Sequence, residues 1–127
     1  MRVKITTKPG QEGYFIVTPH GSIDSDTYQE FQNSITSILV ASTKGICMDL
    51  AGVDYISSAG LGVFFNVNKV MARNNGSLIF SNLKPQIKRL FEIVKALPPE
   101  ILFENAAEAD AYFYKMMNEE IERQKEK

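Results

Sequence analysis

The spacing of apolar positions divides the chain into strand-like and helix-like segments. Runs rich in β-forming or apolar residues predict five short strands, at residues 3–7, 14–18, 46–50, 78–80 and 101–103. The segment Pro9-Gly10-Gln11-Glu12-Gly13 separates the first two runs, so we expect them to form a hairpin. Between the later runs, apolar residues recur every three or four positions, which is the spacing of amphipathic helices.

Four helices are predicted, and they start near Thr27, at Ser58 or Ala59, at Pro85, and after Asn105 as a cap. Thr27 and Glu30 have the spacing of a capping box for the first helix, which we expect to continue through Ile38 and Leu39. The second helix should end at the turn Asn74-Asn75-Gly76. The last one should carry Ala109, Phe113, Met116 and Met117 on one side.

The order of these elements predicts an α/β fold. After the hairpin, strands and helices alternate, which requires parallel pairing through right-handed crossovers. We therefore expect a mixed, mostly parallel sheet of about five strands with four helices packed against it. Residues 1–117 should form a single domain, and residues 118–127, of mixed charge, a helical end or tail. Functional sites in such sheets form at the carboxyl ends of strands, here near Asp24 and around Ser57 and Ser58.

The second predicted helix carries more apolar residues than the single buried stripe of an ordinary surface helix. One stripe is centred on Leu61, Phe65, Asn68 and Ala72, flanked by Phe64 and Met71, and should face the sheet. The opposite side carries Val63, Val67 and Val70. This valine stripe should contact either a neighbouring helix or a partner protein.

Composition narrows the functional classes. The chain has 127 residues, of which 44% are hydrophobic and 23% charged, so one domain with a hydrophobic core is expected. The net charge of −1 gives no reason to expect nucleic acid or an anionic membrane as a partner. No secretory signal or membrane span is apparent, and the single cysteine fits a reducing compartment, so we expect a cytoplasmic protein. With one histidine and one cysteine, neither a metal site nor a cofactor is expected.

The turn before the second helix holds two serines and two glycines. Serine is a preferred N-cap, which is a purely structural explanation for Ser57 or Ser58. Gly60 and Gly62 fall in the first helical turn, where glycine is unfavourable, and this indicates a close backbone approach. A helix N-terminus also stabilises anions, so a phosphate on Ser58 would be tolerated there.

The segment Asp49-Leu50-Ala51-Gly52-Val53-Asp54-Tyr55-Ile56-Ser57-Ser58-Ala59-Gly60-Leu61-Gly62-Val63 resembles the signature of STAS domains, specifically of bacterial anti-sigma factor antagonists. Gly21-Ser22-Ile23-Asp24 resembles a second motif of that family, and the similarity continues through residues 76–78 and 85–91. The resemblance covers roughly residues 3–115 in order and spacing.

This resemblance implies a protein-binding regulator rather than an enzyme. The unphosphorylated domain would bind an anti-sigma factor, often itself a serine kinase, and phosphorylation would end the complex until a serine phosphatase reverses it. The implied phosphoacceptor is Ser58. Ser57 is the alternative, because it offers a second hydroxyl at a position where many members carry aspartate. The implied partner-binding residues are Asp24, Ser57, Ser58, Ala59, Gly60, Leu61, Val63 and Val67.

Two other interpretations remain open from the sequence. The chain could be a STAS subunit of a lipid-trafficking or transporter-associated complex that acts by protein contacts without phosphorylation. It could also be an enzyme with Ser58 as nucleophile beside Asp24, although no plausible base is apparent. We expect a monomer or a weak dimer.

Overall fold

The computed structural model describes residues 1–7, 9–96 and 106–126. It contains four strands, four α-helices and one short 3-10 helix, in the order β1 (Arg2–Thr7), β2 (Tyr14–His20), α1 (Tyr28–Ile35), η1 (Thr36–Ile38), β3 (Gly45–Asp49), α2 (Ser58–Arg73), β4 (Ser77–Ser81), α3 (Pro85–Ala96) and α4 (Ala106–Lys125). The predicted α/β class and hairpin are confirmed. The predicted strand at residues 101–103 and the cap at Asn105 lie outside the described residues.

The strands form one mixed sheet in the order β1-β2-β3-β4, so the described residues contain four strands where about five were expected. β1 pairs antiparallel with β2, while β2–β3 and β3–β4 are parallel. Cys47 in the middle of β3 lies opposite Ile16 of β2 and Ile79 of β4. The carboxyl ends of the three parallel strands therefore meet at one edge of the sheet, where α2 and α3 begin.

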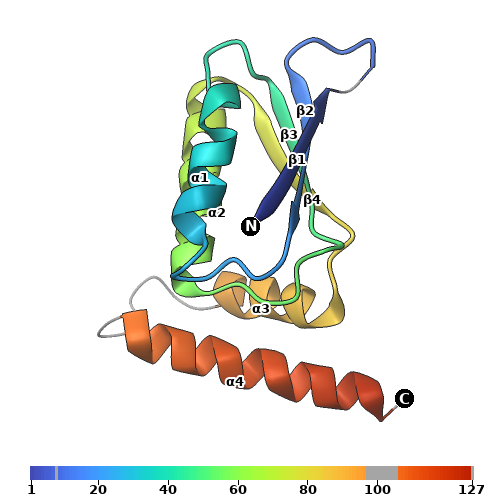
Figure 1. The fold of residues 1–127 in the computed structure, drawn as a ribbon, viewed down its shortest axis with the longest axis vertical. Coiled ribbons are helices and arrows are strands. Elements are labelled where there is room, and N and C mark those ends of the chain that lie inside the picture. The colour runs from blue at the N-terminus through green and yellow to red at the C-terminus, as the bar shows by residue number, and fades with distance from the viewer. Residues whose placement is uncertain (8, 97–105, 127) are drawn as a thin grey trace.

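The helices cover one face and one end of this sheet. Figure 1 shows α1 and α2 side by side on the same face, with α3 crossing the end of the sheet and α4 running beyond it. α4 packs mainly on α3 and also contacts α2, and it buries Phe113 and Met117. In the described part of the chain, no helix combines the length and apolar character needed to cross a bilayer.

The apolar surface of α2 forms one wide stripe rather than two. Its buried residues are Gly60, Leu61, Val63, Phe64, Val67 and Met71. Val63 and Val67 are 1% and 0% exposed, whereas Phe65, expected to face the sheet, is 59% exposed. α2 needs this width because it packs against both β4 and α1, and Phe64 contacts the rings of Phe31 and Phe80. Of the two interpretations of the valine stripe, packing within the chain is therefore correct.

The first helix is shorter than its apolar spacing predicted. α1 ends at Ile35 and continues as η1, which places Ile38 in the core. The hydroxyls of Ser34 and Thr36 donate to main-chain carbonyls four residues back, at 2.8 and 2.9 Å. Such bonds compete with regular helical bonding and favour a helix end.

Candidate functional site

The two turns singled out in the sequence are joined by backbone hydrogen bonds. Ile23, which follows β2, forms an isolated parallel bridge with Ile56. Its N–H donates to the carbonyl of Tyr55 at 2.9 Å, and its carbonyl accepts from the N–H of Ser57 at 2.9 Å. The expectation that both turns lie at the same edge of the sheet is confirmed.

The two serines of the turn have different surroundings. Ser57 is the N-cap of α2, is 3% exposed, and its hydroxyl accepts the N–H of Gly60 at 3.4 Å. Ser58 is the first helical residue and is partly exposed. Its backbone N–H, which no carbonyl of the helix can reach, donates to Oδ1 of Asp110 in α4 at 2.7 Å. The structural role expected of a serine here is thus carried by Ser57, which leaves the hydroxyl of Ser58 for another role.

Replacing Ser57 by alanine should lower the free energy of unfolding by about 1 kcal/mol, because the cap of α2 is lost. Ser58→Ala should change it by less than about 0.5 kcal/mol, because no contact of its hydroxyl supports the helix. Urea unfolding of both variants measures the difference. Equal losses would contradict the separate roles of the two serines.

The glycines of the first turn also differ. A Cβ atom at Gly60 would lie 2.5 Å from the carbonyl oxygen of Ile23 and 2.9 Å from the side chain of Ile56. The predicted close backbone approach is therefore found at Gly60. A Cβ at Gly62 would meet nothing within 4 Å, so the helix is open to solvent at this glycine.

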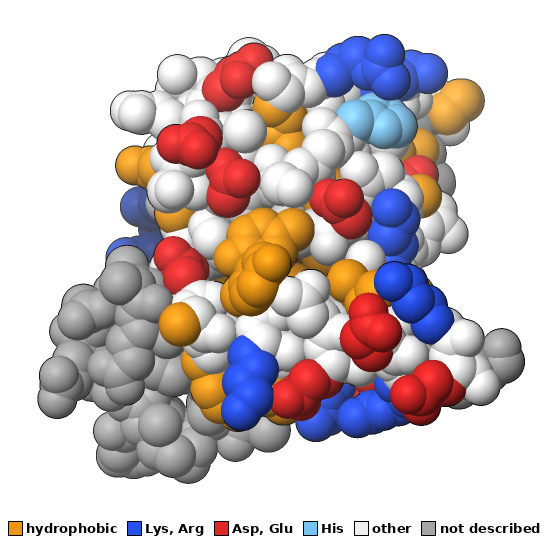
Figure 2. Space-filling view, turned by 60° about the horizontal axis from the view of Figure 1, so that its bottom comes forward, with side chains coloured by type: hydrophobic (Ala, Val, Ile, Leu, Met, Phe, Trp, Pro, Cys, Tyr) orange, Lys and Arg blue, Asp and Glu red, His pale blue; other side chains and the backbone are white. Residues whose placement is uncertain are grey.

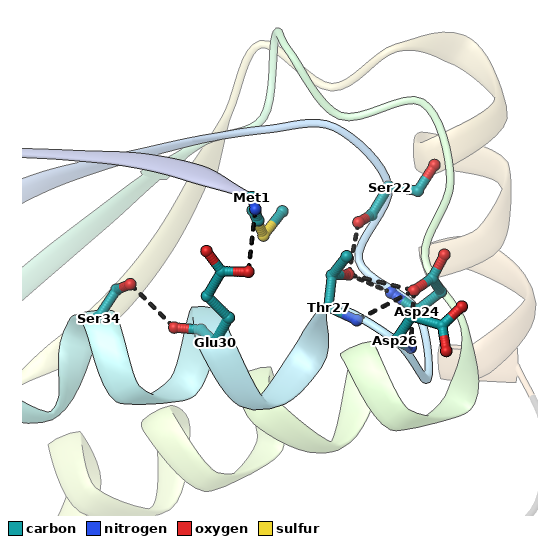
Figure 3. A network of polar contacts seen from close by, with 7 residues as sticks. All are labelled: Met1, Ser22, Asp24, Asp26, Thr27, Glu30 and Ser34. Atoms are coloured by element: carbon teal, nitrogen blue, oxygen red, sulfur yellow. Dashed lines mark hydrogen bonds and ion pairs between the residues drawn. The ribbon is translucent and has the colours of Figure 1, made fainter.

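The Asp24 carboxylate closes the turn that precedes the first helix. Figure 3 shows its carboxylate within the loop before α1, where Oδ1 accepts the N–H groups of Asp26 and Thr27 at 2.9 and 3.1 Å. The expected capping box of Thr27 and Glu30 is not formed, because Thr27 bonds within this loop and Glu30 accepts from the ammonium group of Met1 at 2.9 Å. Asp24 holds the loop that, through Ile23, supports the serine turn.

Two aromatic residues and a second aspartate complete the site. The rings of Tyr55 and Tyr114 meet edge to face with centroids 5.9 Å apart, and Tyr114 is 58% exposed. Burial, and then the negative charges of Asp110 and Asp24 with a smaller effect of Tyr114, raise the pKa of Tyr55 above its usual value. Figure 2 shows this end of the molecule, where apolar side chains gather above α4 with acidic side chains around them. The phenol of Tyr55 is therefore harder to ionise than that of a solvent-exposed tyrosine.

Asp110→Asn should lower the pKa of Tyr55 toward its usual value. The substitution removes a negative charge that opposes formation of the phenolate. Titration of ¹³C-labelled tyrosines by NMR measures this pKa, and Asp26→Asn should leave it unchanged because Asp26 does not contribute to the shift. An unchanged pKa in Asp110→Asn would contradict the proximity of α4 to this ring.

The structure divides the predicted partner-binding residues into two groups. Asp24, Ser58 and Ala59 are partly exposed. The others are buried within the chain, so in this conformation they cannot form a docking surface: Ser57, Gly60, Leu61, Val63 and Val67. The prediction of Val63 and Val67 as partner contacts is corrected accordingly.

The exposed side of α2 next to Ser58 is formed by residues that the sequence analysis did not select. Gly62 and Phe65 follow Ser58 at four and seven residues, so the three share one side of the helix, which we call the Ser58 face. Helical spacing counted from Ser58 itself would have found them. No sequence signal linked Asp110 or Tyr114 to this turn.

Comparisons with known proteins agree with this fold. The family model described as STAS domain matches residues 6–109. The anti-sigma-B factor antagonist of Staphylococcus aureus (strain NCTC 8325) is 30% identical over 93 residues, which cover 73% of this chain and 83% of that protein.

Solved structures share the fold at lower identity. The anti-sigma factor antagonist SpoIIAA in its unphosphorylated form aligns with a TM-score of 0.57 and 13% identity, over 87% of this chain and 98% of that one. A sulfate transporter family protein from Wolinella succinogenes aligns with a TM-score of 0.55 and 15% identity, over 89% and 92%. The chain therefore belongs to the STAS domain family, and in sequence it is similar to anti-sigma factor antagonists.

Proposed function

We propose that this protein is a phosphorylation-switched antagonist that binds an anti-sigma factor when Ser58 carries no phosphate. The partner would itself be a serine kinase that phosphorylates Ser58 and so ends the complex, and a serine phosphatase would restore binding. All of this would take place in the cytoplasm. Family membership and the similarity to the S. aureus antagonist support the general role.

Ser58 is chosen as the acceptor because the two serines of the turn have different contacts and different exposure. Ser57 is buried and its hydroxyl caps α2, so modifying it would break the cap and require the turn to open. Ser58 is partly exposed, and the contact recorded for it is made by its backbone N–H. A kinase can reach that hydroxyl without unfolding the first turn of α2.

Electrostatics supplies the switch. Phosphorylation adds a charge of about −1.5 to −2 to the Ser58 face at neutral pH. In a protein interface this dianion would lose its water, which costs several kcal/mol unless the partner provides cations for it. A cost of about 4 kcal/mol corresponds to roughly a thousandfold weaker binding, enough to separate the proteins.

Phosphopeptide mapping tests this assignment. The purified protein is incubated with Mg-ATP and the candidate anti-sigma kinase from its own host, and the product is analysed by tandem mass spectrometry. We expect one phosphate on Ser58, retained in Ser57→Ala and absent in Ser58→Ala. Label on Ser57, or none on either serine, would contradict the proposal.

Binding measurements extend the test. Ser58→Asp should bind the anti-sigma factor at least tenfold more weakly than the unmodified protein, and Ser58→Ala should bind it even in the presence of ATP. Isolation of the complex from the host distinguishes the alternative role. Co-purification of membrane-transport subunits without an anti-sigma factor would favour a STAS subunit that works without phosphorylation.

A further inference from the structure

The last described helix contacts the serine turn. Asp110 is 52 residues away from Ser58 in the sequence, yet its carboxylate accepts the N–H of Ser58 at 2.7 Å. This distance is typical of a hydrogen bond to a charged acceptor. The N-terminus of α2 therefore already holds an anionic group, supplied by the chain itself.

Tyr114, one helical turn after Asp110, makes the second contact of α4 with this turn through the ring of Tyr55. Phe113 and Met117 anchor α4 in the core shared with α3. Among the contacts described, the start of α4 meets the serine turn through a hydrogen bond to a carboxylate and a ring contact, whereas its apolar side packs on α3.

We propose that phosphorylation of Ser58 displaces Asp110 and releases the first described turns of α4 from the serine turn. A phosphate on the Ser58 hydroxyl lies beside the backbone N–H of the same residue, where the helix end favours an anion. Asp110 occupies that N–H, so the dianion and the carboxylate compete for the same donor and repel each other. Asp24 on the adjacent loop adds to the negative charge around Tyr55.

This inference rests on the proposed function only in taking Ser58 as the acceptor. It adds that the phosphorylated and unphosphorylated proteins differ in structure as well as in charge. A partner could therefore distinguish them by the position of α4 in addition to the phosphate itself.

Hydrogen exchange measured by mass spectrometry tests the proposal without any kinase. Phosphoserine is incorporated at position 58 during synthesis, and exchange is compared with the unmodified protein. We expect peptides covering residues 110–117 to exchange at least tenfold faster, while peptides from β2 and β3 stay unchanged. Phosphoserine at Ser37, an exposed residue of η1, is the control for added charge and should have no effect on residues 110–117.

A second variant separates competition from general destabilisation. Asp110→Ala removes the acceptor, so without phosphate it should already increase exchange in residues 110–117, and phosphoserine at position 58 should add little to it. Equal exchange in the phosphorylated and unmodified proteins would overturn the inference, and so would a large additional effect of phosphate in Asp110→Ala.

Partner binding is measured on the same samples. Loss of binding with unchanged exchange would leave the proposed function intact and reject the displacement of α4. Faster exchange with unchanged binding would support the displacement and reject the proposed function.

Discussion

Gly60→Ala is expected to lower the free energy of unfolding by about 2 kcal/mol, because overpacking at a backbone contact outweighs the gain in helix propensity. The new methyl group would lie 2.5 Å from the carbonyl oxygen of Ile23 and 2.9 Å from two isoleucine side chains. That carbonyl also accepts the N–H of Ser57, so moving it apart from α2 would strain the bond that joins the two turns. Denaturant unfolding measures the loss directly.

Gly62→Ala is the matched control, and it should change stability in the opposite direction. It lies two residues later in the same helix, its Cβ would meet nothing within 4 Å, and alanine favours the helix by about 0.5–1 kcal/mol. A stabilising Gly60→Ala, or a destabilising Gly62→Ala of similar size, would show that the close approach of α2 to Ile23 is not as described.

Gly62→Arg is expected to weaken binding to the anti-sigma factor at least a hundredfold, about 2.7 kcal/mol, with little effect on folding. An arginine there would stand in the middle of the Ser58 face, between Ser58 and Phe65. Its side chain would keep a partner protein from packing against this face. The fold tolerates it because the position opens to solvent. Isothermal titration calorimetry gives the affinity, and thermal unfolding verifies that the protein is intact.

Ala72→Arg provides the control for this prediction. It adds the same side chain to an exposed position near the other end of α2, away from Ser58. Binding should stay within about threefold of the unmodified protein. If Ala72→Arg weakens binding as much as Gly62→Arg does, or if neither does, the partner docks elsewhere and the Ser58 face is not its site.

The sequence predicted the site correctly where local turn signals and the strand topology point to the same place. The Ser57–Ser58 turn and the Asp24 loop were expected to meet because both follow parallel strands, and the backbone bonds of Ile23 join them. The resemblance to the family then selected Ser58, and burial of Ser57 gives that choice a physical basis.

The sequence predictions that were wrong or missing have identifiable physical causes. The predicted sheet-facing stripe of α2 was wrong in placing Phe65 there, because the buried stripe is broad, includes Val63 beside Phe64, and packs against both the sheet and α1. The predicted capping box is absent because Glu30 accepts from the ammonium group of Met1 and the N–H of Thr27 donates to Asp24. Asp110 could not have been found, because its contact with Ser58 depends on how α4 returns to the start of α2, which no local spacing encodes.

The order of the strands has a consequence for how the protein is made. Because the sheet order follows the chain, each described strand pairs with the one synthesised just before it, so the sheet can assemble as the polypeptide leaves the ribosome. The serine turn can form at that stage as well. Asp110, however, lies 52 residues after Ser58, so the serine turn leaves the ribosome well before the carboxylate that accepts its N–H does.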